Sequence, residues 1–268
     1  MQIFVDEDLK RVFKQIHQLE KQLLDGNVQS LEVRKLLQDI LEHKFDKLAT
    51  QALGWYILPE EQLANVRGWS EERVWGFSDS DFPSTIPDFV PRAPLEVLVL
   101  SVYLPDTGQG RSKVPGYIRT ADELWQIARS RQPNWWQWDA LHLDTDHLRL
   151  LPGTEDSHAP GIRWTAVDLG AHWNAKDGVR PRDVRGADSA HAEILAAAAH
   201  FPNWIQAMDG EKVPHVWLPG YQVTIPGRGA WAGVPVLGWY GADREVGLSA
   251  FWDAYRSWDY ALPVRREL

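Results

Sequence analysis

Carboxylate and imidazole side chains are concentrated between positions 158 and 200, and this region is the best candidate for acid–base chemistry. Asp168 and His172 follow a predicted strand and stand four residues apart. Glu193 and His200 stand seven apart on a predicted helix, so they share one helical face. Such groups act as general acids and bases, and they also bind zinc or iron. We therefore name these four residues as candidate catalytic residues.

A purely structural role for the same region is the alternative. Four consecutive alanines, 196–199, would let the helix pack closely against a bulky sheet. No two histidines here show a recognised metal spacing, so no metal or other cofactor is indicated. The sequence also lacks the P-loop, G-x-S-x-G, HExxH and dinucleotide-binding patterns. With no cysteine, it has neither a thiolate ligand nor a cysteine nucleophile.

The residues before Asp168 form a predicted strand, 162–167. Side chains alternate along a strand, so Asp168 falls on the same face as the buried even-numbered residues. A buried carboxylate needs a partner, because an unpaired buried charge is too costly. The candidates are His172, an arginine or a backbone N–H, and the last would make this a polar turn.

Around these residues, the body at 95–268 is predicted to be α+β, with a Trp-rich mixed or antiparallel sheet and a few packed helices. Residues 95–104 are nearly continuously apolar and are the best candidate for a central strand. Thr120 and Glu123 form a capping box that predicts a helix start. An alanine-rich helix is expected at 189–201. Further short strands are expected at 141–151, 215–218, 221–225, 234–240 and 245–252, the last two as a hairpin.

The first 55 residues are predicted to form a helical hairpin. Apolar residues recur there at spacings of three and four, as in a heptad seam. The segment 6–41 is therefore a candidate surface for a protein partner or a homodimer, although it would equally suit packing on the rest of the chain. Residues 56–94 are expected to hold a helix that begins near Pro59, followed by a proline-rich connector.

Tryptophan is the most unusual feature of the composition. All 15 Trp lie between positions 55 and 258. Exposed Trp side chains stack on sugars or bases and anchor protein interfaces. Trp135, Trp136 and Trp138 lie together in PNWWQWD, where two consecutive Trp point in different directions. We name these three as candidate binding residues.

Charge and hydropathy limit the partners. The net charge is −9, with basic and acidic residues interspersed, which disfavours nucleic acid as a general partner. No run approaches the ~20 apolar residues of a membrane span. The first residues, MQIFVDEDLKRVFKQ, lack the pattern of a signal peptide. We therefore expect a soluble, cytoplasmic protein that does not contact a membrane, and the absence of cysteine fits a reducing compartment.

Several strings of the sequence have a familiar pattern: HAEILAAAAHFPNWIQAMDG, VPHVWLPGY, SWDYALPVRREL, LEVRKLLQDILE, PEEQLANVR, RTADELWQIA and GIRWTAVDLG. In these strings, which together extend over most of the chain, the sequence resembles an uncharacterised family of bacterial and metagenomic proteins. That resemblance implies no activity and transfers no catalytic residue.

Three functions remain open from the sequence. The first is a binding or interaction protein that uses a Trp-rich surface or pocket, with a protein or a small molecule as ligand. The second is a hydrolase-type enzyme with a His/carboxylate site, which could include a metal. The third is an accessory protein that acts on nucleic acid or on a nucleic-acid enzyme. We favour the first, because the sequence lacks the catalytic motifs named above, whereas its excess of tryptophan is clear.

Overall fold

A computed structural model describes residues 54–109, 113–154, 159–173, 178–210, 212–241 and 243–268. The chain divides into two compact units, Met1–Gly54 and Trp55–Leu268. The predicted helical hairpin at 1–55, with the candidate partner surface at 6–41, lies outside the described residues, apart from its last two residues.

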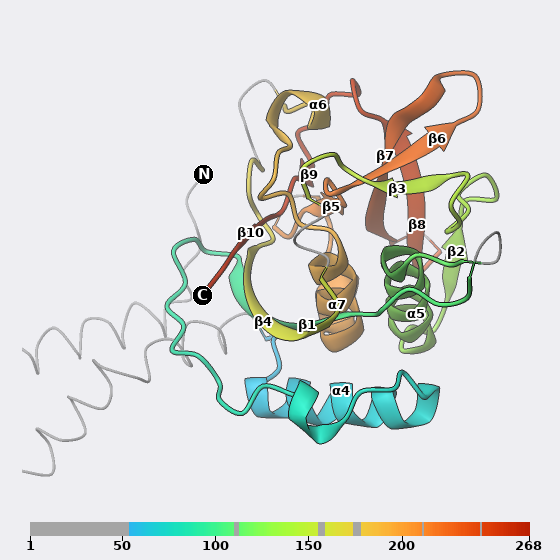
Figure 1. Cartoon of the computed structure of the whole chain (residues 1–268). Coiled ribbons are helices and arrows are strands. Elements are labelled where there is room, and N and C mark those ends of the chain that lie inside the picture. Colours follow the sequence, from blue (N-terminus) through green and yellow to red (C-terminus); the bar gives the residue numbers. More distant parts are fainter. Residues whose placement is uncertain (1–53, 110–112, 155–158, 174–177, 211, 242) are drawn as a thin grey trace, which may run out of the picture. The chain divides into compact units, whose positions relative to one another are not determined.

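The described part of the second unit contains two sheets (Figure 1). The smaller sheet has three antiparallel strands in the order β1-β4-β10. They are β1 (Glu96–Tyr103), β4 (Gly161–Asp168) and β10 (Val264–Arg266). All eight residues of β1 are buried, because helices pack against this strand.

The larger sheet has seven strands and is centred on a long strand, β7 (Gly229–Tyr240). The others are β2 (Trp135–Gln137), β3 (Leu148–Leu150), β5 (His215–Trp217), β6 (Tyr221–Ile225), β8 (Glu245–Trp252) and β9 (Tyr260–Ala261). β7 pairs antiparallel with β5, β6 and β8, whereas β2 runs parallel to β8 and β9 runs parallel to β5. The sheet is therefore mixed, and its β7–β8 pair is the predicted hairpin.

Helices cover the sheets on several sides. The helices are α4 (Pro59–Arg73), a 3-10 turn η2 (Asp79–Asp81), α5 (Gly116–Ser130), α6 (Pro181–Val184), α7 (Ala192–His200) and α8 (Pro202–Gln206). Every residue of α7 is buried, since its alanines let it pack closely against α5 and β1 (Figure 1). The expected mixture of helices and sheets is confirmed, as are the helix near Pro59 and the alanine-rich helix. None of the helices in the described part of the chain combines the length and the apolar character needed to cross a membrane.

One edge of β1 is covered by side chains instead of a strand. The Gln62 amide donates through Nε2 to the Leu98 carbonyl at 3.0 Å and accepts through Oε1 from the Leu100 N–H at 2.9 Å. The next carbonyl along the strand, that of Leu100, accepts from His200 Nε2 at 3.0 Å. The backbone groups of Leu98 and Leu100 that these three bonds reach are thus satisfied without a further strand.

Two expectations for this region were wrong in detail. β1 is an edge strand among the described residues, not a central one, because helices and the Gln62 side chain supply the burial. The helix expected to begin at the Thr120 capping box begins at Gly116. The Thr120 hydroxyl accepts a hydrogen bond from the Leu104 N–H at 2.8 Å, so it helps to cover the edge of β1.

Candidate functional site

Asp168 ends β4 and lies in a polar turn. Its Oδ1 accepts a hydrogen bond from the Gly170 N–H at 2.9 Å, which is the backbone partner allowed by the sequence. Burial raises the pKa of Asp168, while the Gly170 N–H acts in the opposite direction. His172 is exposed and has a positive φ of 59°.

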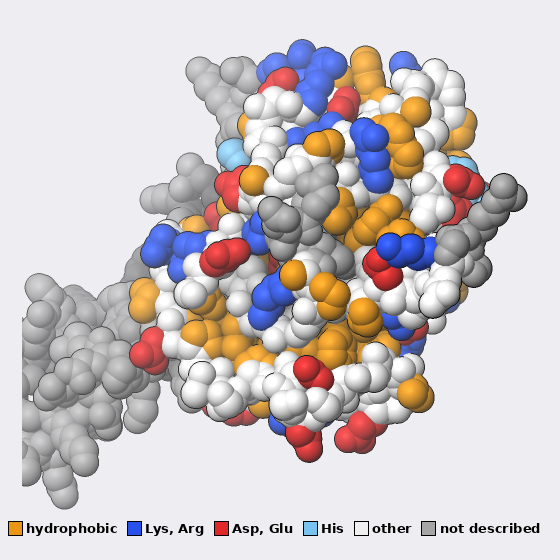
Figure 2. Space-filling view, viewed as in Figure 1, with side chains coloured by type: hydrophobic (Ala, Val, Ile, Leu, Met, Phe, Trp, Pro, Cys, Tyr) orange, Lys and Arg blue, Asp and Glu red, His pale blue; other side chains and the backbone are white. Residues whose placement is uncertain are grey.

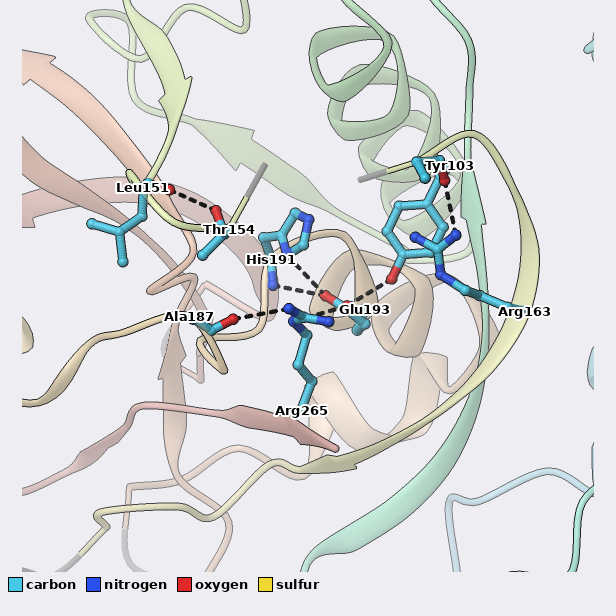
Figure 3. Close-up of polar contacts among 9 residues, drawn as sticks. Tyr103, Leu151, Thr154, Arg163, Ala187, His191, Glu193 and Arg265 are labelled. Atoms are coloured by element: carbon cyan, nitrogen blue, oxygen red, sulfur yellow. Dashed lines mark hydrogen bonds and ion pairs between the residues drawn. The ribbon is translucent and has the colours of Figure 1, made fainter. Parts of the chain in front are cut away.

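Glu193 lies in the first turn of α7 and is completely buried. The Tyr103 hydroxyl donates to its Oε1 at 2.6 Å, and the His191 backbone N–H donates to its Oε2 at 2.8 Å. His191 Nδ1 lies 3.2 Å from the same Oε2, and Arg265 Nε lies 3.9 Å from Oε1. Figure 3 shows these three side chains converging on Glu193 from different elements. We call these four residues the Glu193 cluster.

The Glu193 cluster keeps its carboxylate ionised. Burial alone would raise the pKa of Glu193, but the neighbouring His191 and the Tyr103 hydroxyl outweigh it and hold that pKa well below its usual range. Burial also raises the pKa of Tyr103 well above its ordinary value, and the adjacent Glu193 charge adds to the effect. The carboxylate therefore accepts hydrogen bonds from the Tyr103 hydroxyl and the His191 backbone N–H at neutral pH, and it faces the His191 imidazole as a charged neighbour.

Strand register separates the Glu193 cluster from Asp168. Residues directly opposite each other in a sheet point to the same side, and alternate residues share a face. The pairs Tyr103–Gly161 and Arg265–Val167 place both cluster side chains on one face. Asp168 lies one residue beyond Val167 and belongs to the other face. The three-stranded sheet therefore stands between the Asp168 and Glu193 side chains.

His200 ends α7, two turns away from Glu193. Its imidazole is buried against the Trp69 ring, with ring centroids 4.8 Å apart. Burial lowers the pKa of His200 to about 3, so the side chain is neutral and donates to Leu100. The structure thus brings Glu193 together with His191, Tyr103 and Arg265, and does not bring it together with Asp168, His172 or His200.

The catalytic role of Asp168, His172, Glu193 and His200 stays a prediction. Within the described ranges, no group of three or more His, Cys, Asp or Glu side chains could hold a metal ion. Sequence reasoning missed Tyr103 and Arg265, which come from distant strands. The only local signal was HAE at 191–193, which puts an imidazole two residues before the carboxylate.

Trp135 lies at an exposed position of β2. Its side chain is 46% exposed, and the Arg129 guanidinium lies 4.2 Å from the ring centroid. Trp136 is half-buried against Tyr240, with ring centroids 5.2 Å apart, and Trp138 is also half-buried. Binding by these three residues likewise stays a prediction.

A second aromatic region lies where two distant segments meet. We call GVRPRDVR, 178–185, the arginine segment and FWDAYRSW, 251–258, the aromatic segment. Val179 N donates to Ser257 O at 3.1 Å, and Arg182 N donates to Asp253 O at 3.2 Å. An ion pair between Arg185 and Asp253, at 2.8 Å, completes the junction.

Trp252 is the centre of the exposed surface at this junction. Its side chain is 41% exposed, and the guanidinium carbons of Arg228 and Arg182 lie 5.2 Å and 5.8 Å from its ring centroid. Tyr255 stacks on Phe251 with centroids 5.4 Å apart. Figure 2 shows Lys and Arg side chains gathered at the α6 end of the molecule, next to hydrophobic ones. We call the two segments together with Arg228 the arginine–tryptophan surface.

Comparison of the chain with protein-family models, with curated proteins and with solved structures finds no match. We therefore infer the function from the geometry of the two candidate sites.

Proposed function

We propose that this chain is a binding protein and that its arginine–tryptophan surface binds an anionic partner. One observation carries the proposal: two guanidinium groups from different elements flank an exposed indole ring. Arg182 belongs to α6, Arg228 to the turn between β6 and β7, and Trp252 to the end of β8. Arginine beside Trp is a recurrent means of holding an anion together with a flat or apolar group.

The charge of this surface is opposite to that of the whole chain. The net charge is −9, yet Arg182 and Arg228 are both exposed, and neither has an acidic partner among the described residues. Surface charges farther away than the Debye length, about 10 Å at 0.1 M salt, are largely screened. The local arginines, and not the net charge, therefore determine which partner approaches Trp252.

Retention on a polyanionic resin tests this proposal. We expect the protein to be retained at low salt, and Arg182→Gln and Arg228→Gln each to elute at a lower salt concentration. The matched control is Arg129→Gln with Trp135→Ala, which removes a different Arg–Trp pair, whose ring is also exposed. A control that elutes early, while the first two variants elute like the wild type, would instead place binding at Trp135.

A second candidate function, hydrolysis, is favoured by the Glu193 cluster. His191 Nδ1 lies 3.2 Å from the Glu193 carboxylate, close enough for the carboxylate to orient the imidazole as a general base once the two fully buried side chains become accessible to a substrate. Release of a chromogenic leaving group from ester and phosphodiester substrates tests it. A rate in the wild type that Glu193→Gln abolishes, while the variant stays folded, would support hydrolysis; equal rates would exclude this role for Glu193.

A further inference from the structure

The aromatic segment exposes three rings in succession. Trp252, Tyr255 and Trp258 are 41%, 50% and 62% exposed and follow one another every third residue. Aromatic side chains usually bury most of their area, so three neighbours this exposed on one short segment leave part of each ring accessible to a ligand. Phe251 covers one face of Tyr255, and a planar group that reaches Trp252 lies beside the guanidiniums of Arg182 and Arg228. A ligand that matches the segment would itself carry flat groups in succession.

Every positive charge within the arginine–tryptophan surface, as defined by its residues, is an arginine. The arginine segment, the aromatic segment and position 228 contain no lysine. A guanidinium is planar, forms paired hydrogen bonds to a phosphate and stacks on rings, whereas an ammonium is a compact point charge. Phosphate and carboxylate both suit a guanidinium, so this choice of side chain favours an anionic group that stands beside a planar one.

The surface is also fixed in place before any partner binds. Backbone hydrogen bonds join Val179 to Ser257 and Arg182 to Asp253. Arg228 is held at the tip of the β6–β7 turn between two glycines with positive φ, Gly227 at 77° and Gly229 at 93°. The backbone that carries the arginines and the rings therefore needs little ordering on binding.

Resting on the proposed function, we infer that the anionic partner is a single-stranded nucleic acid. Such a strand repeats a phosphate and an accessible base, and proteins bind it by combining positive charge with aromatic stacking. Arg182 and Arg228 contact phosphates, and Trp252 stacks on a base. A duplex hides its base faces, and an acidic peptide offers carboxylates without a repeated ring, so both match the surface less well.

Fluorescence anisotropy of a labelled oligothymidine, titrated with the full chain at several salt concentrations, tests the inference. For two phosphate contacts, the logarithm of the association constant should fall with log[salt] at a slope of about −1.4. Arg182→Gln or Arg228→Gln should each reduce that slope by about 0.7. Trp252→Ala should weaken binding about 5- to 150-fold, because it removes stacking on a base.

Competition experiments distinguish binding of a single strand in particular from binding of anions in general. A duplex of the same length and a poly-aspartate peptide should both compete poorly, and Trp135→Ala should bind like the wild type. If either competitor displaces the strand at equal concentration, or if Trp252→Ala binds normally, the single-strand inference is overturned while anion binding stands. If no polyanion binds, both are overturned. Circular dichroism of each variant excludes misfolding as the cause.

Discussion

The Arg185 guanidinium donates a hydrogen bond to the Asp253 carboxylate at 2.8 Å, and both side chains are largely buried, with exposures of 9% and 13%. The two residues are 68 positions apart. Asp253 directly follows Trp252, so this pair holds the aromatic segment beside the arginine segment. The geometry of the exposed arginine–tryptophan surface therefore depends on an ion pair beneath it.

Removing one partner of that pair should be costly. Asp253→Ala leaves the Arg185 charge buried without its counter-ion, and we expect a loss of about 3 kcal/mol in the free energy of unfolding, measured in urea. Replacing both side chains, as in Arg185→Met with Asp253→Leu, should recover part of that loss, since no buried charge then remains. A cost below about 1 kcal/mol for Asp253→Ala would contradict a structural role for the pair.

Gln62 should be essential for the edge of β1. Gln62→Ala leaves the buried Leu100 N–H without its acceptor, and we expect the free energy of unfolding to fall by about 2 kcal/mol. Glu61→Ala, on the exposed side of the same helix, is the matched control and should change stability by less than about 0.5 kcal/mol. Equal stability of the two variants would mean that water satisfies this edge.

Buried His200 should make the fold sensitive to acid. Its pKa is about 3 in the folded chain and about 6.5 when unfolded, so the unfolded state binds the proton first as the pH falls. Stability is thus lost below pH 6.5, and His200 should account for about 2 kcal/mol between pH 7 and pH 5. In His200→Gln, whose amide can still donate to Leu100, this part of the pH dependence should vanish. Exposed His172→Gln should keep it, and identical profiles for all three proteins would refute the assignment.

Elements with a local signal were predictable from the sequence. The β7–β8 hairpin joins two apolar strands through a short polar segment of the sequence, and α7 has an uninterrupted run of helix-forming residues. The polar turn after Asp168 was one of three stated alternatives, because a carboxylate at a strand end commonly accepts a nearby N–H. In each case, the deciding contacts lie within a few residues of one another.

Contacts between distant segments were not predictable. The continuous apolar run of β1 is typical of a central strand, but here helices and the Gln62 side chain supply the burial. The partner of Glu193, Tyr103, lies 90 positions away, and no periodicity reports such a pairing. The pairing of Arg185 with Asp253 could not be read from the sequence either. The only sequence feature that pointed to the arginine–tryptophan surface was the presence of three arginines in one short segment.

The Glu193 cluster gives the last prediction. Glu193→Gln removes the charge that faces His191 and Arg265, so we expect the free energy of unfolding at pH 7 to fall by about 3 kcal/mol. Tyr103→Phe removes one hydrogen bond to Glu193, and we expect it to lower the same free energy by about 2 kcal/mol. Because the folded pKa of Glu193 is depressed, its contribution is present above about pH 4.5 and is lost as the pH falls further. Urea unfolding at pH 7 and pH 3 should therefore show a smaller acid-induced loss for Glu193→Gln than for the wild type. Glu267→Gln, at an exposed position, serves as the control and should match the wild type. A Glu193→Gln protein as stable as the wild type would show that this buried carboxylate does not stabilise the fold. A catalytic role for Glu193 would then be favoured.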